Sequence, residues 1–209
     1  MKNKFILFDF DGVIADSFEI AFETKKDICP GITREDYRRR FEGNVNDIQI
    51  EETYHNEQCN HDLDWFDVYV PKMKEVRIFP GMEELIFALE KEYALIIISS
   101  TITFPIEEFL VAHNLRDHFD WVMGNDVHKS KVEKIKMVFD KYGAASKDCL
   151  FITDTLGDMR EAEETGVPAI GVTWGFCSPE TLQKGNPLKL VSNATELKTA
   201  ITDHFSANR

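Results

Sequence analysis

The segment Phe5-Ile6-Leu7-Phe8-Asp9-Phe10-Asp11-Gly12-Val13 joins an apolar run to two closely spaced acids. Consecutive apolar residues before an acid are typical of a strand buried inside a parallel sheet. Gly12 then permits the turn that ends this strand. Because residues two apart in extended structure point to the same side, Asp9 and Asp11 can reach one point in space.

Two carboxylates at the end of a buried strand repel each other unless a cation lies between them. A hard divalent cation with oxygen ligands, Mg²⁺ above all, suits this position. The alternative is an ordinary Asp-Gly turn in which Asp9 and Asp11 are both solvated, because turns favour these residue types. The apolar run and three later segments of the chain favour the metal site over the turn.

The length and composition indicate a globular protein. A chain of 209 residues can form one domain with an insertion, or two small ones, and it can bury a sufficient core without disulfides. Hydrophobic residues make up 43% and charged residues 29% of the chain, which excludes a disordered protein. The net charge of −13 argues against nucleic acid or an anionic membrane as a partner.

The sequence also favours a cytoplasmic location. The apolar run after the N-terminal residues is too short for a signal peptide, and no stretch approaches the roughly 18 apolar residues of a membrane helix. Cys29, Cys59, Cys149 and Cys177 are scattered, without a C-x-x-C pair. We therefore expect neither a zinc site nor a disulfide scaffold, as in a protein of a reducing compartment.

Two later strands also end in polar groups. Residues 93–98 form an apolar, β-branched run that stops at Ser99-Ser100-Thr101. These hydroxyls can belong to a turn or helix cap, or they can bind a ligand at the carboxyl end of a parallel strand. Residues 149–153 form another strand, which ends at Asp154-Thr155-Leu156-Gly157-Asp158. Asp158 suits the first turn of the next helix, whereas Asp154 precedes that helix and needs another explanation.

Strands alternate with helices along most of the chain. Residues 119–124, 167–173 and 188–191 complete the set of predicted strands, and a helix that Lys131 opens ends at Gly143. This alternation predicts an α/β fold, a Rossmann-like doubly wound parallel sheet with right-handed crossovers. The chain has no G-x-G-x-x-G and no Walker loop, so neither a dinucleotide site nor a P-loop nucleotide site is supported.

Residues 16–79 are predicted to form an inserted α-helical cap. Asp16 or Ser17 can cap a first helix, Thr33 can cap a second, and no convincing strand lies between residues 15 and 80. The catalytic core would then comprise residues 1–15 and 80–209. Further candidates for the interior of the cap include Ile48 and Tyr54.

The cap carries a run of arginines, Arg38-Arg39-Arg40. Such a run is usually a solvated helix face, but one of the three can instead turn toward an anionic substrate. His55 and His61 could also face a cleft, although a lone histidine is more often structural.

Taken together, the strand ends resemble those of the haloacid dehalogenase superfamily, in its phosphoglycolate-phosphatase-like branch. Residues 8–13 look like the first family motif, Ser99 occupies the place of the second, and residues 154–158 look like the fourth. Residues 171–176 are similar to the final strand and loop of this branch. For the third motif, a lysine, Lys129 and Lys131 compete, and the spacing to Gly143 favours Lys131. Thr153 departs from the family, which commonly has Gly or another small residue there.

The resemblance implies an Mg²⁺-dependent phosphatase that hydrolyses a small phosphomonoester, phosphoglycolate-like or a sugar phosphate, through an aspartyl phosphate. It implies that Asp9 is the nucleophile and that Asp11 is the general acid and base. The other implied roles concern the metal and the phosphate. Asp9, the Asp11 carbonyl and Asp154 would hold Mg²⁺, Asp158 would bind it through water or orient the site, and Ser99, Ser100 and Lys131 would bind phosphate.

Other functions on the same residues remain open. A sugar-phosphate mutase would return the phosphoryl group to its substrate, and a phosphate-binding regulator would lack turnover. A dehalogenase is disfavoured, because Asp11 would have no leaving alkoxide to protonate. The expected partner is a small phosphorylated metabolite, and either a monomer or a homodimer is compatible with the sequence.

Overall fold

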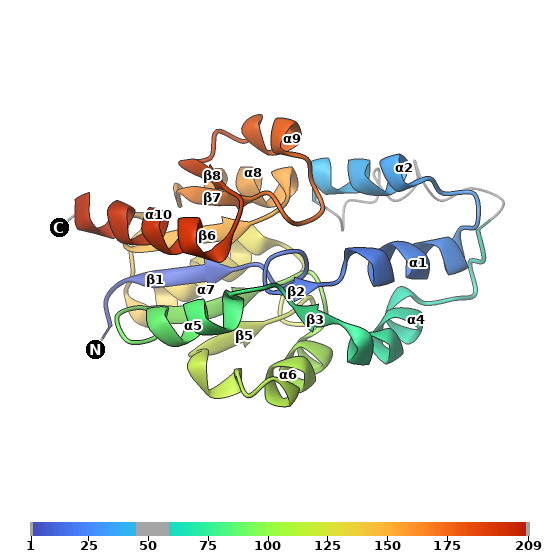
Figure 1. Cartoon of the computed structure of the whole chain (residues 1–209), viewed down its shortest axis with the longest axis horizontal. Coiled ribbons are helices and arrows are strands. Elements are labelled where there is room, and N and C mark those ends of the chain that lie inside the picture. The colour runs from blue at the N-terminus through green and yellow to red at the C-terminus, as the bar shows by residue number, and fades with distance from the viewer. Residues whose placement is uncertain (1, 45–58, 208–209) are drawn as a thin grey trace.

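The computed structural model describes residues 2–44 and 59–207 and has a central sheet of parallel strands (Figure 1). The strand order is β5-β4-β1-β6-β7-β8, with β1 in the interior. The strands are β1 (Phe5–Phe8), β4 (Ala94–Ile98), β5 (Trp121–Met123), β6 (Cys149–Thr153), β7 (Ala169–Val172) and β8 (Lys189–Val191). The prediction of a doubly wound parallel sheet is confirmed, because the chain extends outward from β1 on both sides.

The register of β1 brings the polar strand ends together. Phe8 pairs with Ile97 of β4 on one side and with Ile152 of β6 on the other. Asp9 therefore follows β1 at nearly the same level at which Ser99 follows β4 and Asp154 follows β6. Parallel strands place all three carboxyl ends at one edge of the sheet.

Helices cover both faces of the sheet, and the alternation along β1 explains why. Ile6 and Phe8 pack with α5 (Met82–Leu89), α6 (Thr103–Ala112) and α10 (Ala194–Ala207). Phe5 and Leu7 point to the other face, where they pack with α7 (Lys131–Tyr142), α8 (Leu156–Glu164) and α9 (Pro179–Gln183). Short 3-10 turns, η3 (Arg116–His118) and η4 (Ser146–Asp148), precede β5 and β6.

The described parts of the predicted cap, residues 16–44 and 59–79, lie beyond the carboxyl ends of the strands and away from both termini (Figure 1). Its described helical elements are α1 (Phe18–Ile28), α2 (Arg34–Arg39), η1 (Arg40–Glu42), α4 (Trp65–Lys72) and η2 (Met73–Glu75). Thr33 caps α2 as predicted, since its hydroxyl accepts from the Asp36 amide at 3.1 Å. The division into core and cap stays a prediction of the sequence. Ile48, Tyr54 and His55 lie outside the described residues.

The prediction that residues 15–80 contain no strand is wrong at the two ends of the cap. β2 (Ala15–Asp16) and β3 (Arg77–Ile78) pair antiparallel, with Ala15 opposite Ile78 and Asp16 opposite Arg77. Strands this short carry no recognisable alternation of apolar and polar residues. They join the two points at which the chain leaves and re-enters the core.

The expectation of no disulfide is also wrong for one pair of cysteines. Cys29 and Cys59 are bonded to each other across a sequence separation of 30, while Cys149 and Cys177 are buried thiols. No C-x-x-C pattern predicts this pair, because only the folded chain brings Cys59 close to the C-terminal end of α1. The amide of Asn60 donates to the carbonyl of Ile28 at 2.7 Å, at the same junction.

The apolar stretches of the described helices belong to this packed interior. None of the helices within residues 2–44 and 59–207 is long and apolar enough to cross a membrane.

Candidate active site

A buried lysine joins two acids at the end of β1. Asp9 is 6% exposed, and its Oδ1 accepts from the Phe10 amide at 2.7 Å and lies 2.9 Å from Lys131 Nζ. Lys131, the first residue of α7, also donates to Asp158 Oδ2 at 2.7 Å. Lys129, the competing candidate, is exposed. Of the two lysines, Lys131 is therefore the one that contacts the first acid.

Burial and charge shift the acidities in this cluster. Burial raises the pKa of Asp9 well above its usual value; the charge of Lys131 opposes this, and the nearby Asp158 and Asp154 add to it. Burial alone would lower the pKa of Lys131, but the Asp158 and Asp9 carboxylates outweigh it and raise that pKa. Burial would raise the pKa of Asp158, but the charge of Lys131 and several hydrogen bonds hold it below its usual value. Asp158 and Lys131 are therefore a charged pair.

Asp154 is fully buried and has one carboxylate oxygen without a hydrogen-bond partner. Its Oδ2 accepts from the Phe176 amide at 2.7 Å, while its buried Oδ1 has no partner among the described residues. Burial raises the pKa of Asp154 to about 7 against the effect of the Phe176 amide. Gly12, at φ 77°, passes so close that a Cβ there would lie 2.0 Å from Asp154 Oδ2. An orphaned buried oxygen of this kind needs a proton or a cation.

These observations fit a small divalent cation. Burial raises the pKa values of both predicted carboxylate ligands, Asp9 and Asp154, and the Asp11 carbonyl is the third predicted ligand. Among residues 2–44 and 59–207, no three acidic, histidine or cysteine side chains gather into a metal-binding group. Asp158 Oδ2 accepts hydrogen bonds from Lys131 and Thr153. These bonds suit a role in orienting Lys131 rather than direct ligation of a metal ion.

The Asp11 carboxylate accepts three hydrogen bonds from three parts of the chain. Its Oδ1 accepts from Ser17 Oγ at 2.8 Å and from the Tyr69 hydroxyl at 2.5 Å. Its Oδ2 accepts from Thr101 Oγ1 at 2.7 Å. Ser17 occupies the position before α1 at which a helix cap was predicted, but its side chain makes no capping bond. The Ser17 hydroxyl donates its hydrogen bond to Asp11 instead.

The loop after β4 has a buried hydroxyl ready to donate. Ser99 is 1% exposed, and its Oγ accepts from the Thr101 amide at 3.0 Å. Its own O–H is therefore available to an anion. Beneath the loop, Lys134 Nζ donates to the carbonyls of Ser99 and Gly124. Burial, with the charge of Lys131, lowers the pKa of Lys134 to about 8.

Thr153 takes part in the site although it departs from the family pattern. Its Oγ1 donates to Asp158 Oδ2 at 2.8 Å and accepts from the Thr155 amide at 3.1 Å. A glycine at this position could make neither bond. The departure therefore adds a hydrogen bond to Asp158 rather than disturbing Asp154.

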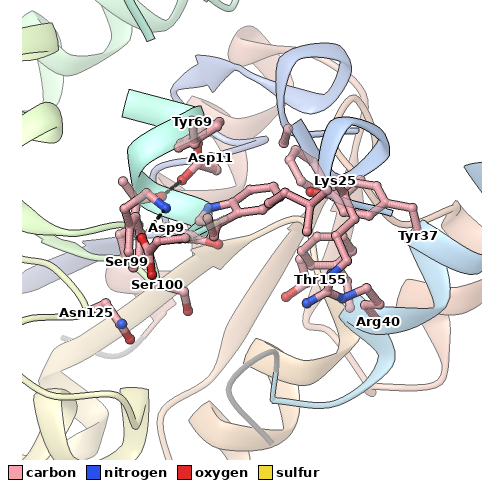
Figure 2. Close-up of a pocket in the computed structure, with 18 of the residues that line it drawn as sticks. Asp9, Asp11, Lys25, Tyr37, Arg40, Tyr69, Ser99, Ser100, Asn125 and Thr155 are labelled. Atoms are coloured by element: carbon pink, nitrogen blue, oxygen red, sulfur yellow. Dashed lines mark hydrogen bonds between the residues drawn. The ribbon is translucent and has the colours of Figure 1, made fainter. Parts of the chain in front are cut away.

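A pocket of about 710 Å³ opens between these groups and the cap (Figure 2). On the core side it is lined by predicted site residues, namely Asp9, Asp11, Ser99, Ser100, Lys131 and Asp158, together with Thr101 and Asn125. Asp154 is not among the lining residues and is fully buried. The predicted phosphate-binding and catalytic side chains thus share one cavity.

The three consecutive arginines, Arg38, Arg39 and Arg40, have different surroundings. Arg40 lines the pocket and is 9% exposed. Arg38 lies over the ring of Phe18, and its Nε donates to the Phe176 carbonyl at 3.1 Å. Arg39 is exposed and pairs with Glu35 and Asp36 on its own helix. Only one of the three therefore faces the cavity, which also has His61 on its wall.

Several residues of the site escaped sequence reasoning. Tyr69 and Lys134 belong to no motif, Ser17 was considered only for a helix cap, and Thr101 was considered for a turn, a cap or ligand binding but not as a partner of Asp11. Tyr69 was not among the predicted core positions; its place among apolar cap residues could have indicated a buried side chain, but not its partner. Figure 2 shows the Tyr69 side chain reaching from the cap to Asp11.

Comparison with protein families gives one model match across most of the chain. The family described as haloacid dehalogenase-like hydrolase matches residues 6–172. A solved structure with a similar fold is a haloacid dehalogenase-like family hydrolase from Streptococcus pneumoniae, with a TM-score of 0.78 and 21% identity. The similarity covers 95% of this chain and 98% of the S. pneumoniae chain.

Three curated relatives are between 23% and 28% identical to this chain. The 5'-nucleotidase of Pseudomonas aeruginosa is 27% identical over 152 residues, which cover 71% of this chain and 68% of the relative. The phosphoglycolate phosphatase of Yersinia pseudotuberculosis is 23% identical, over 94% of this chain and 92% of the relative. The phosphoglycolate phosphatase of Synechococcus elongatus is 28% identical over 128 residues. This match spans 61% of this chain and 60% of the relative.

Proposed function

The chain belongs to the haloacid dehalogenase-like hydrolases, and we propose that it is a phosphatase that hydrolyses a small phosphomonoester through an aspartyl phosphate on Asp9. The relatives named as phosphoglycolate phosphatase and 5'-nucleotidase act on esters of this kind, in the words of their names. The observation that carries the proposal is the contact of 2.9 Å between Lys131 Nζ and Asp9 Oδ1, two residues that line the pocket.

Asp9 would attack the phosphorus atom and expel the alcohol. A carboxylate is a weak nucleophile, but the acyl phosphate it forms divides one difficult displacement into two easier ones. Lys131 and the hydroxyls of Ser99 and Ser100 would bind the phosphoryl oxygens as charge spreads over them. Lys131 also holds Asp9 in place before the substrate arrives.

Asp11 would give a proton to the leaving alkoxide and later take one from the attacking water. Hydrogen bonds with Ser17, Tyr69 and Thr101 hold its carboxyl group in place for both steps.

Mg²⁺ held by Asp9, Asp154 and the Asp11 carbonyl would supply positive charge that offsets the phosphate and the two carboxylates. Asp158, paired with Lys131, would orient that lysine. The buried Oδ1 of Asp154, for which residues 2–44 and 59–207 supply no hydrogen-bond partner, supports this assignment.

The test is phosphate release from a panel of phosphomonoesters by the wild type and by Asp9→Asn, with Mg²⁺ and with excess chelator. Release that needs both Asp9 and Mg²⁺ supports the proposal. Undiminished release by Asp9→Asn, or in excess chelator, contradicts it. A mutase would release little phosphate and would need a bisphosphate primer, and a phosphate-binding regulator would release none.

A further inference from the structure

Lys134 is a buried cation that takes no part in the chemical steps proposed for this site. It follows Lys131 by three residues on α7, so the two side chains leave the same face of the helix. Lys134 is 0% exposed and Lys131 is 2% exposed, whereas Lys136 on the same helix is exposed to solvent. Because lysine is almost never fully buried without partners for its ammonium group, the contacts of Lys134 show what its charge does here.

The two buried lysines bind different parts of the site. Lys131 pairs with two carboxylates. Lys134 Nζ instead donates to two backbone carbonyls, that of Ser99 at 2.5 Å and that of Gly124 at 3.3 Å. These two residues follow β4 and β5, which are neighbours in the sheet. Since Lys134 is not among the residues that line the pocket, it acts on the two loops rather than on a substrate.

The loops after β4 and β5 are also bonded directly to each other. The Ser99 amide donates to the Met123 carbonyl, and the Asn125 amide donates to the Thr101 carbonyl, both at 2.9 Å. Gly124 packs so closely on the other loop that a Cβ there would lie 2.6 Å from the Thr101 carbonyl oxygen. The two loops therefore form one unit, and the buried ammonium group bridges them.

The bond to the Ser99 carbonyl fixes the plane of the peptide group between Ser99 and Ser100. The peptide bonds of residues 2–44 and 59–207 are all trans, and in a planar trans peptide the N–H points opposite to the C=O. With its carbonyl directed toward Lys134, this peptide directs the Ser100 amide to the other side. Ser99 and Ser100 both line the pocket, where Figure 2 shows them beside Asp9. A phosphoryl group bound there would meet a backbone whose orientation Lys134 sets.

The charge of Lys134 strengthens this restraint. Burial, with the charge of Lys131, lowers the pKa of Lys134 to about 8, while Asp9, Asp158 and Glu161 oppose the shift. At neutral pH most molecules therefore keep Lys134 protonated. Hydrogen bonds from a charged donor are about twice as strong as those between neutral groups, so an ammonium group holds the two carbonyls more firmly than a neutral side chain would.

We propose that Lys134 is a positioning residue whose ammonium group holds the loops after β4 and β5 together and orients Ser99 and Ser100 to bind the phosphoryl group. This inference rests on the proposed phosphatase function and adds to it a residue that does not touch the substrate. The first turn of α7 then orients both halves of the site. Lys131 holds the nucleophile Asp9, and Lys134 holds the phosphate-binding loop.

The test replaces Lys134 with methionine, which has a similar length but neither charge nor donor. Inorganic phosphate, added with Mg²⁺, is expected to raise the melting temperature of the wild type, and Lys134→Met is expected to need ~10-fold or more phosphate for the same shift. Its kcat/KM is expected to fall by a similar factor for alkyl and aryl phosphates alike, because both present the same phosphoryl oxygens. The shift caused by Mg²⁺ alone is expected to equal that of the wild type, since Asp9 and Asp154 are unchanged.

Two further variants complete the design. Lys136→Met is the matched control, because Lys136 lies on the solvent side of the same helix and pairs with Glu133, and it is expected to keep the wild-type values. Lys134→Gln keeps a polar group but removes the charge, and it is expected to show the same selective loss to a smaller degree. If Lys134→Met does not fold, the same measurements on Lys134→Gln decide.

The outcomes separate this inference from the function on which it rests. A folded Lys134 variant with the wild-type response to phosphate and the wild-type kcat/KM overturns the inference and leaves the phosphatase function standing. Equal losses in the responses to phosphate and to Mg²⁺ alone also overturn it, because Lys134 would then support only the fold. A wild type that hydrolyses no phosphomonoester refutes the phosphatase function itself, and this inference with it.

Discussion

The hydroxyl of Tyr69 donates a hydrogen bond of 2.5 Å to Oδ1 of Asp11, and so connects α4 of the cap to the acid that follows β1. Tyr69 is 1% exposed, and burial, with the nearby charge of Asp11, raises its pKa well above the usual value. Tyr69 therefore remains a protonated donor throughout the ordinary pH range. The position of the cap and the orientation of Asp11 are linked through this bond.

Tyr69→Phe is expected to slow the hydrolysis of alkyl phosphates by ~10-fold or more, because one hydrogen bond to a charged group is worth about 1.5–3 kcal/mol. Electron-poor aryl phosphates need less help from Asp11 as an acid and are expected to lose less. The measurement is kcat for both ester types, with Tyr142→Phe on α7 as the control, since Tyr142 lies away from the pocket lining. Equal losses for both esters would show that Tyr69 supports only the fold.

Asp9→Asn and Asp11→Asn are expected to fail in different ways. Without Asp9 no phospho-enzyme forms, so turnover of every ester falls to background. Without the proton donor Asp11, alkyl esters lose ~10²–10⁴-fold, the usual range for general acid catalysis, whereas aryl esters are partly spared. Hydrolysis of the intermediate still needs a base, so an aryl ester is expected to give a burst of phenol before slow turnover. Equal losses and no burst with Asp11→Asn would refute its role as acid and base.

The raised pKa of Asp154 predicts how pH affects the metal-free protein. Its value of about 7 in the folded protein exceeds the ordinary 3.8, so between these limits the folded state binds more protons than the unfolded state. The free energy of unfolding should therefore fall as pH rises across this window. Mg²⁺ competes with that proton, so it should raise the melting temperature more at about pH 8 than at about pH 5. The comparison is thermal unfolding with Mg²⁺ and with chelator at both values.

Asp154→Asn is the control for this prediction. It removes the titrating group, and it should reduce both the pH dependence in chelator and the additional stabilisation by Mg²⁺. Equal stabilisation by Mg²⁺ at both pH values in the wild type would contradict the proposed ligand pair, Asp9 and Asp154.

The disulfide between Cys29 and Cys59 can be checked by counting thiols. The unreduced, denatured protein is expected to expose the thiols of Cys149 and Cys177 alone, with the other pair appearing after reduction. Reduction, or Cys59→Ser, is expected to lower the free energy of unfolding by about 2–4 kcal/mol. Four reactive thiols in the unreduced protein would show that the pair is not bonded under the conditions of isolation.

The sequence predicted the parts of the site that are attached to strand ends. Asp9 and Asp154 each follow an apolar run, and Lys131 opens a helix, so the periodicity that reveals these elements also locates the residues. Ser17 was assigned to a helix cap because its local sequence favours capping, and the fold used its hydroxyl for Asp11 instead. The bonds of Tyr69 and Cys59 depend on contacts between distant parts of the chain, for which no local pattern exists.

The second junction between cap and core depends on Gly157 in α8. A Cβ at this residue would lie 2.1 Å from the carbonyl oxygen of Gly43, a backbone atom that cannot move without shifting the end of η1. Nearby bonds hold the same junction: Asn44 donates to Glu161 at 3.1 Å, and Arg160 donates to the Glu42 carbonyl.

Gly157→Ala is therefore expected to separate the cap from the core at this point. In an unobstructed helix, the change from glycine to alanine stabilises a protein by up to about 1 kcal/mol. A decrease in stability would therefore indicate the contact between Gly157 and Gly43, and an increase would indicate an unobstructed helix. We expect a lower melting temperature and a loss of kcat/KM, because η1 ends at this junction and its first residue, Arg40, lines the pocket. A raised melting temperature with unchanged kinetics would show that Gly43 and Gly157 do not press together in solution.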